Sequence, residues 1–222
     1  MEDSFRIIAP TYPAVTTMVE LADGLAGLLR AEGITQAHVL AGSFGGMVAQ
    51  VFMRRYPKLT GRVVLSTTAA PNAELAERYR QQVEMLRAAP PELVASVSKP
   101  SFLQMIAPPE AESAFWRGYV DELFSERLSK EDQISTALCL LDFVENYRLS
   151  PDDMKDWAGR ILILESEDDA TFDAAARDGL RALYPAALVH TFANAGHSPG
   201  TTQRDTFFAI VRTFFESGRL QP

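Results

Sequence analysis

Short apolar segments alternate with amphipathic segments in the first third of the chain. The segments FRIIAP, AHVLAG and GRVVLST, at residues 5–10, 37–42 and 61–67, have the length and the apolar character of strands. Residues 17–33 and 46–56 separate them and carry leucine, valine and methionine at helical spacing. This order predicts a β-α-β-α-β unit, which is typical of a mostly parallel sheet flanked by helices.

Three sites have the residues of a helix start. Thr17 and Glu20 stand at the spacing of a capping box, in which the two side chains bond to each other's backbone amides. Ser129 with Asp132 has a similar spacing, and Ser150 comes directly before a proline, which the first turn of a helix tolerates. Each site predicts a helix that begins at the residue after its Thr or Ser.

The middle of the chain differs from its two ends. Residues 72–159 contain amphipathic stretches without a convincing strand, whereas residues 160–166 (RILILES) and 187–193 (ALVHTFA) again read as strands. A helix is predicted between those strands, at residues 173–184, and another at 202–218. We therefore divide the chain into a first part of an α/β core at residues 1–71, a helical insertion at 72–159 and a second part of the core at 160–222.

Charge and cysteine content exclude several classes of protein. The formal net charge is −8, and the basic residues form no block that would follow a phosphate backbone, so nucleic acid is not expected as a partner. The lone cysteine, Cys139, cannot form an internal disulfide, and no apolar run is long enough to span a membrane. The first residues are acidic where a signal peptide would be basic. We expect a soluble cytoplasmic protein that does not associate with a membrane.

Ser43 is the first candidate for chemistry. It lies between a predicted strand and a predicted helix, in the sequence LAGSFGGMVAQ, with Ala41 two residues before it and Gly45 two residues after it. A nucleophile on such a sharp turn needs small residues at both places, in the pattern G-x-S-x-G, and Ala41 is a small departure from that pattern. The backbone amide of Phe44, at the start of the helix, could donate to a developing oxyanion. A serine that only caps a helix or forms a turn would look the same, so the rest of the chain must decide.

A base and an acid follow in the order that the chemistry requires. A serine hydroxyl needs a base to take its proton, and that base needs a carboxylate to orient it. His197 lies in a loop of small residues after one predicted strand, and carboxylates, among them Asp168, Asp169 and Asp173, follow the strand before it. The spacing alone does not choose among these acids.

These segments resemble the α/β-hydrolase superfamily, in particular its esterase and lactonase-like branch with an inserted helical cap. HVLAGSFGGMVAQVFMRRYP is similar to the family's nucleophile elbow, RILILESEDDATF to its acid strand and loop, and NAGHSPGTTQRDTFFAIVRTFF to its histidine loop and last helix. The resemblance implies Ser43 as nucleophile, Asp169 as acid and His197 as base, with Asp168 as the alternative acid. Ser166 stands where the family usually has a glycine before the acid. The implied substrate is a small carboxylic ester, thioester or lactone.

The resemblance also shows what the chain lacks. Family members usually have further strands before the segment that corresponds to residues 5–10, with a loop that supplies a second oxyanion donor. We expect either that the remaining strands close up, bringing the loop at Pro10, Thr11 and Tyr12 near Ser43, or that the chain is an incomplete form of a longer enzyme. The missing second donor predicts weak activity. Apolar surface left exposed along residues 5–10 and 37–42 predicts low solubility or self-association.

Neither a cofactor nor a metal is expected. His38, His190 and His197 lack the close spacing of zinc ligands. A non-catalytic binding protein or fragment of this fold is the alternative function, and a lyase or perhydrolase using the same three residues is a third, because the fold does not fix the reaction.

Overall fold

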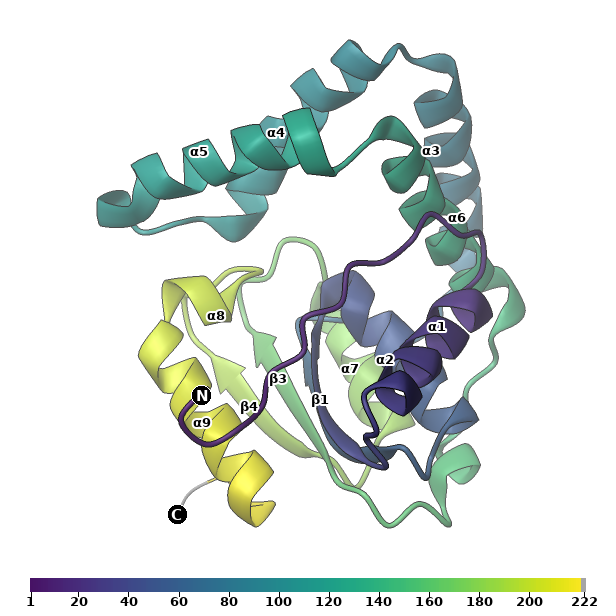
Figure 1. Ribbon diagram of the computed structural model, residues 1–222, viewed down its shortest axis with the longest axis vertical. Helices are drawn as coiled ribbons and strands as arrows, with labels where there is room; N and C mark the ends of the chain where they lie inside the picture. Colours follow the sequence, from purple (N-terminus) through teal and green to yellow (C-terminus); the bar gives the residue numbers. More distant parts are fainter. Residues whose placement is uncertain (221–222) are drawn as a thin grey trace.

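Four parallel strands form the centre of the molecule. The computed structural model describes residues 1–220 (Figure 1). The strands lie in the order β1-β2-β3-β4 and every neighbouring pair is parallel. They are β1 (Ala37–Gly42), β2 (Thr60–Ser66), β3 (Ile161–Ser166) and β4 (Leu188–Phe192). The parallel sheet predicted from the alternating pattern is confirmed.

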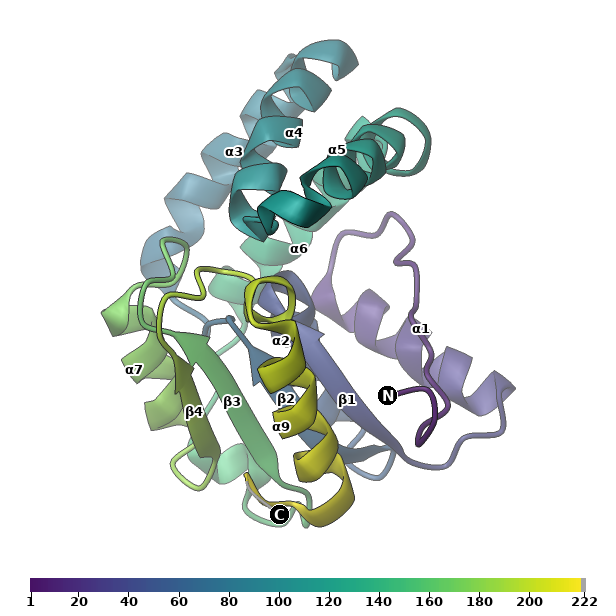
Figure 2. The ribbon, with the colours of Figure 1, turned by 90° about the vertical axis from the view of Figure 1, so that its left-hand side faces the viewer.

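Helices cover both faces of the sheet (Figure 2). They are α1 (Met18–Ala31), α2 (Ser43–Arg55), α7 (Ala174–Leu183) and α9 (Arg204–Ser217). Because successive strand residues point to opposite faces, Val63 and Leu65 pack with α2 and α7, whereas Val64 packs with α9. Helix α1 lies outside α2 and shares a core with it. This two-sided burial explains why three consecutive residues of β2, Val63, Val64 and Leu65, are apolar.

The segment between β2 and β3 is helical, as predicted. Its elements are η1 (Ala73–Leu75), α3 (Ala76–Ala88), α4 (Pro91–Ile106), η2 (Glu110–Glu112), α5 (Ser113–Glu122), η3 (Leu123–Arg127), α6 (Lys130–Asn146) and η4 (Pro151–Met154). Figures 1 and 2 show α3 to α6 beyond the carboxyl ends of the strands, on the side where α2 begins. Two polar contacts join this segment to the end of the chain: Ser198 donates to the carbonyl of Met105 at 2.9 Å, and Arg204 pairs with Glu112 at 2.8 Å.

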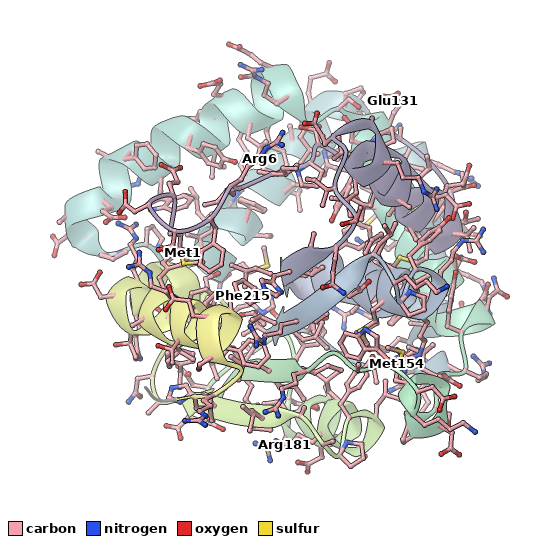
Figure 3. The ribbon with its side chains drawn as sticks, turned by 60° about the horizontal axis from the view of Figure 1, so that its bottom comes forward. Met1, Arg6, Glu131, Met154, Arg181 and Phe215 are labelled. Carbon is pink, nitrogen blue, oxygen red and sulfur yellow. The ribbon has the colours of Figure 1, made fainter. Side chains whose placement is uncertain are left out.

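The predicted strand at residues 5–10 is wrong. These residues are extended but pair with no strand, and Ile7 is 53% exposed. The start of the chain is held instead by side chains on α9: Phe5 meets the ring of Phe215 edge-on at 6.0 Å between centroids, and Met1 packs against the same cluster (Figure 3). An apolar segment becomes a strand only where a neighbouring edge accepts its backbone hydrogen bonds. This one crosses from α9 towards α1 without meeting such an edge, so β1 remains an edge strand.

The predicted helix starts are confirmed at Thr17, Ser129 and Ser150, each with both hydrogen bonds of a capping box. Ser150, however, begins only a short 3₁₀ helix. Two other boundaries differ from the prediction. Helix α2 begins at Ser43, three residues earlier than expected. The helix predicted at residues 202–218 is α9, which begins two residues later than expected and follows a short helix, α8 (Pro199–Thr202). Within residues 1–220, no helix combines the length and the apolar character needed to cross a bilayer.

Candidate active site

Ser43 occupies a strained turn between β1 and α2. Its φ of 48° lies in the left-handed region, which residues other than glycine seldom adopt. The preceding Gly42 is extended, so the chain turns sharply into the helix at Ser43 itself. The carbonyl of Ser43 accepts a hydrogen bond of 2.7 Å from the hydroxyl of Thr68, which lies two residues after the neighbouring strand β2. A serine that only capped the helix would occupy an extended N-cap position, and Ser43 does not.

The first turn of α2 approaches Thr68 very closely. A Cβ on Gly46 would lie 2.6 Å from the Cβ of Thr68, so no other residue fits there without movement. At Gly45, by contrast, an added Cβ would be at ordinary contact distance, with the Tyr12 hydroxyl 3.7 Å away. The sequence pattern drew attention to Gly45, yet the tight approach falls one residue later. The only feature of the sequence that could have indicated the close approach at Gly46 is that a second glycine follows Gly45.

His197 and Asp169 form a buried pair. The Nδ1 atom of His197 lies 3.0 Å from each carboxylate oxygen of Asp169, and the two residues are 8% and 6% exposed. The other ring nitrogen, Nε2, is buried and hydrogen-bonds to nothing within residues 1–220. One nitrogen is therefore held by a carboxylate while the other remains free to accept a proton.

Asp169 is held as an anion. Burial by itself would raise the pKa of Asp169, but hydrogen bonds from His197 and from the amides of Thr171 and Phe172 outweigh it, and the pKa lies below the ordinary 3.8. The amide of Thr171 donates at 2.8 Å and that of Phe172 at 3.3 Å. A carboxylate with several donors stays ionised at neutral pH and can stabilise a protonated imidazole.

The neighbouring carboxylates have other partners. Asp168 accepts hydrogen bonds of 3.0 Å from the amides of Ala195 and Gly196, just before His197, and so holds the histidine loop. Asp173 accepts from the amide of Ala176 at the start of α7, as an N-cap does. The three candidate carboxylates therefore have different partners, and of the three only Asp169 contacts His197.

Ser43 and His197 line the same cavity, which measures about 310 Å³. Phe102, Met105 and Ile106 reach this cavity from α4. Within residues 1–220, no hydrogen bond joins the Ser43 hydroxyl to His197, so the two side chains share a space without being bonded. No sequence signal pointed to Phe102 or Ile106, because apolar residues on a helix are most often simply packed.

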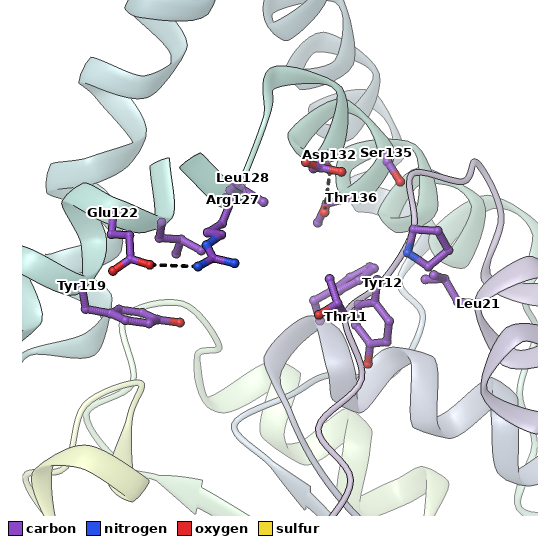
Figure 4. Close-up of a pocket in the computed structure, with 13 residues that line it drawn as sticks. Thr11, Tyr12, Leu21, Tyr119, Glu122, Arg127, Leu128, Asp132, Ser135 and Thr136 are labelled. Carbon is purple, nitrogen blue, oxygen red and sulfur yellow. Dashed lines mark hydrogen bonds and ion pairs between the residues drawn. The ribbon is translucent and has the colours of Figure 1, made fainter. Parts of the chain in front are cut away.

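A second cavity, of about 530 Å³, is lined by the loop before α1, by Phe44 in the first turn of α2 and by residues of the helical segment (Figure 4). Phe44 and Tyr12 form part of its wall, and Arg127 and Asp132 add charge from the helical segment. The amide of Phe44 is in the first turn of α2, where backbone N–H groups have no partner inside the helix. Phe44 thus carries a free donor next to Ser43. No group of three or more potential metal ligands occurs among the residues that the structure describes.

A family model described as the alpha/beta hydrolase family matches residues 3–210. The chain belongs to that family. No curated protein gives a significant match. Among solved structures, this alpha/beta hydrolase is similar to a thermophilic esterase from Thermogutta terrifontis, with 23% identity, a TM-score of 0.67, and coverage of 93% of this chain and 75% of that one.

Two further structures have the same fold. A hydrolase from Pseudomonas aeruginosa has 19% identity and a TM-score of 0.72, with 95% of this chain and 75% of that chain covered. An enol-lactonase from Burkholderia xenovorans has 18% identity and a TM-score of 0.69, with 90% and 74% covered. The alpha/beta hydrolase fold and an enzyme of the hydrolase type, both expected from the resemblance, are confirmed.

Proposed function

We propose that this alpha/beta hydrolase cleaves a small carboxylic ester, thioester or lactone by way of an acyl-enzyme. The observation that carries the proposal is the state of His197. Asp169 holds Nδ1, while the buried Nε2 is unpartnered within residues 1–220 and the ring borders the same cavity as Ser43. A general base for a serine hydroxyl requires this arrangement, in which Nδ1 is held by a carboxylate and Nε2 can accept the proton.

In the proposed reaction, Ser43 Oγ attacks the carbonyl carbon while its proton passes to Nε2 of His197. The tetrahedral intermediate collapses as the protonated His197 gives that proton to the leaving oxygen or sulfur, and an ester of Ser43 remains. Water then loses a proton to Nε2 as it attacks the acyl carbon. The second tetrahedral intermediate collapses when His197 gives that proton to Ser43 Oγ, which releases the acid and restores Ser43. Asp169 stays ionised and stabilises the imidazolium in both halves. These steps need neither a cofactor nor a metal.

The helical segment at residues 72–159 is proposed as a cap over this site, with residues 1–71 and 160–222 as the two parts of the core. Three residues of α4 contribute to the cavity that contains Ser43, and the contact of Ser198 with Met105 ties α4 to the residue after His197. A cap of this kind would select the substrate and exclude water. The proposed partner is therefore a small molecule with an ester-like bond.

Fluorophosphonate labelling tests the proposal, because the reagent forms a stable adduct only with an activated serine. The wild-type protein should gain one adduct on the peptide that contains Ser43, whereas Ser43→Ala and His197→Ala should gain none. Ser96→Ala, at an exposed serine on α4, is the matched control and should label as wild type does. Folded wild-type protein that gains no adduct and hydrolyses no short p-nitrophenyl ester would refute the proposal.

The alternative, a binding protein without catalysis, is favoured by one observation: within residues 1–220, the hydroxyl of Ser43 is not hydrogen-bonded to His197. Apo enzymes often have loose catalytic contacts that tighten when substrate binds. Labelling separates the two functions, since a binding protein would leave Ser43 unmodified.

A further inference from the structure

Tyr12 lies against the first turn of α2. Its hydroxyl oxygen is 3.7 Å from the point where a Cβ on Gly45 would be, and its ring meets the ring of Phe44 edge-on, with 6.0 Å between centroids and an interplanar angle of 80°. Gly45 and Phe44 are the two residues after Ser43. Figure 4 shows Tyr12 next to Thr11 in the wall of the larger cavity. Although 31 positions separate Tyr12 from Ser43 in the sequence, the fold brings it to the turn that carries the nucleophile.

The Tyr12 hydroxyl is an unused donor. Its side chain is partly buried, and within residues 1–220 the hydroxyl makes no hydrogen bond, in contrast to the hydroxyls of Tyr56 and Tyr184. Burial raises the pKa of Tyr12 above the ordinary 10.0, so the group keeps its proton at neutral pH. Pro10 and Pro13 flank the segment and restrict its backbone. A protonated donor is thus held in place beside α2 without a partner.

The proposed reaction needs such a group. The oxygen of the tetrahedral intermediate is an anion, and oxyanion holes commonly use two or more donors aimed at it. The amide of Phe44 supplies one. Residues 5–10, which the resemblance relates to a strand of the core, form no strand here, and the chain continues from them directly to Tyr12.

We propose that the hydroxyl of Tyr12 is the second oxyanion donor, acting with the amide of Phe44 on the oxygen that becomes negative when Ser43 attacks the carbonyl. This inference rests on the proposed serine hydrolase function. Tyr12 then hydrogen-bonds to the transition state more strongly than to the substrate, because the acceptor is an anion only in the former.

The test compares Tyr12→Phe with Tyr79→Phe. Tyr79 is the matched control because it is also partly buried, its hydroxyl has no partner within residues 1–220, and it borders neither cavity. Tyr12→Phe should lower kcat for a p-nitrophenyl ester about a hundred-fold, with KM nearly unchanged, while Tyr79→Phe matches wild type. The affinity for an alkyl boronic acid, which forms a tetrahedral adduct with the serine, should fall by a similar factor.

Two further measurements exclude a merely structural effect. The melting temperature of Tyr12→Phe should equal that of wild type, since no hydrogen bond is lost; if the variant is unstable, Tyr12→Met removes the hydroxyl with a more adaptable side chain. A thionoester, whose sulfur accepts hydrogen bonds poorly, should react much more slowly than the oxygen ester with wild type, and this difference should shrink in Tyr12→Phe.

The outcomes are separable. Folded Tyr12→Phe with wild-type kcat and boronate affinity overturns the assignment of Tyr12 and leaves the hydrolase function intact. A rise in KM with unchanged kcat also overturns it, because Tyr12 would then only bind substrate. Wild-type protein that neither hydrolyses the ester nor labels at Ser43 overturns the proposed function, and this inference with it.

Discussion

Replacing Asp169 by asparagine tests the proposed pairing at the atom where it acts. The Oδ1 atom of Asp169 accepts from the amides of Thr171 and Phe172, and an asparagine oxygen can keep both hydrogen bonds. Its NH₂ group then takes the place of Oδ2 beside Nδ1 of His197, which lies 3.0 Å from both Oδ1 and Oδ2. An NH₂ group donates, so Nδ1 would become an acceptor and the imidazole proton would move to Nε2. The nitrogen that should accept the proton of Ser43 would already carry one.

The expected loss in kcat is roughly ten thousand-fold, or about 5 kcal/mol of transition-state stabilisation. Initial rates with a short p-nitrophenyl ester at neutral pH measure it. Asp168→Asn is the control, since an asparagine oxygen can still accept from the amides of Ala195 and Gly196, and its rate should stay within about ten-fold of wild type. The reasoning is refuted if Asp169→Asn retains wild-type turnover while Asp168→Asn collapses, because the role would then belong to the neighbouring residue.

Three further predictions concern stability and association. Gly46→Ala forces a Cβ against Thr68 and disturbs its hydrogen bond to Ser43, so urea unfolding should show a free energy of unfolding lower by about 1–3 kcal/mol. Gly27→Ala is the control because an added Cβ there lies in open space on α1, and it should leave the free energy of unfolding unchanged or raise it by about 0.5–1 kcal/mol. Because the pKa of Asp169 is lowered in the folded protein, its contribution to stability is present above the unfolded value, near 3.8, and is lost as pH falls below it; the stability difference between wild type and Asp169→Asn should therefore shrink in acid. Self-association should appear as a concentration-dependent sedimentation coefficient and should weaken in Ile7→Lys, where the exposed apolar segment at the start of the chain gains a charge; an unchanged coefficient at every concentration would contradict it.

The sequence was informative where the signal was local. Strands β1 to β4 and the helix after Thr17 follow from apolar periodicity and capping residues, which act within a few positions of each other. Residues 5–10 have the same apolar character, yet whether they pair depends on the edge that the rest of the fold offers them. Spacing alone did not separate Asp168 from Asp169, although the resemblance implied Asp169, because adjacent side chains point in different directions and a shift of one residue exchanges their surroundings.

The position of the Tyr12 side chain could not be predicted from the sequence. One expectation brought its loop near Ser43, and the loop does lie against the first turn of α2, although the closing up of strands expected with it does not occur. Nothing in the sequence APTYP indicates whether the ring packs on Phe44 or faces solvent, because that depends on a contact between residues 32 positions apart. The strain at Ser43 has the same origin: a φ of 48° is maintained by the neighbours of the turn, including the bond from Thr68. The geometry of Ser43 thus depends on the residues just after β2 and on the loop before α1, and substitutions at Thr68 or Tyr12 should alter turnover although neither belongs to the proposed Ser-Asp-His triad.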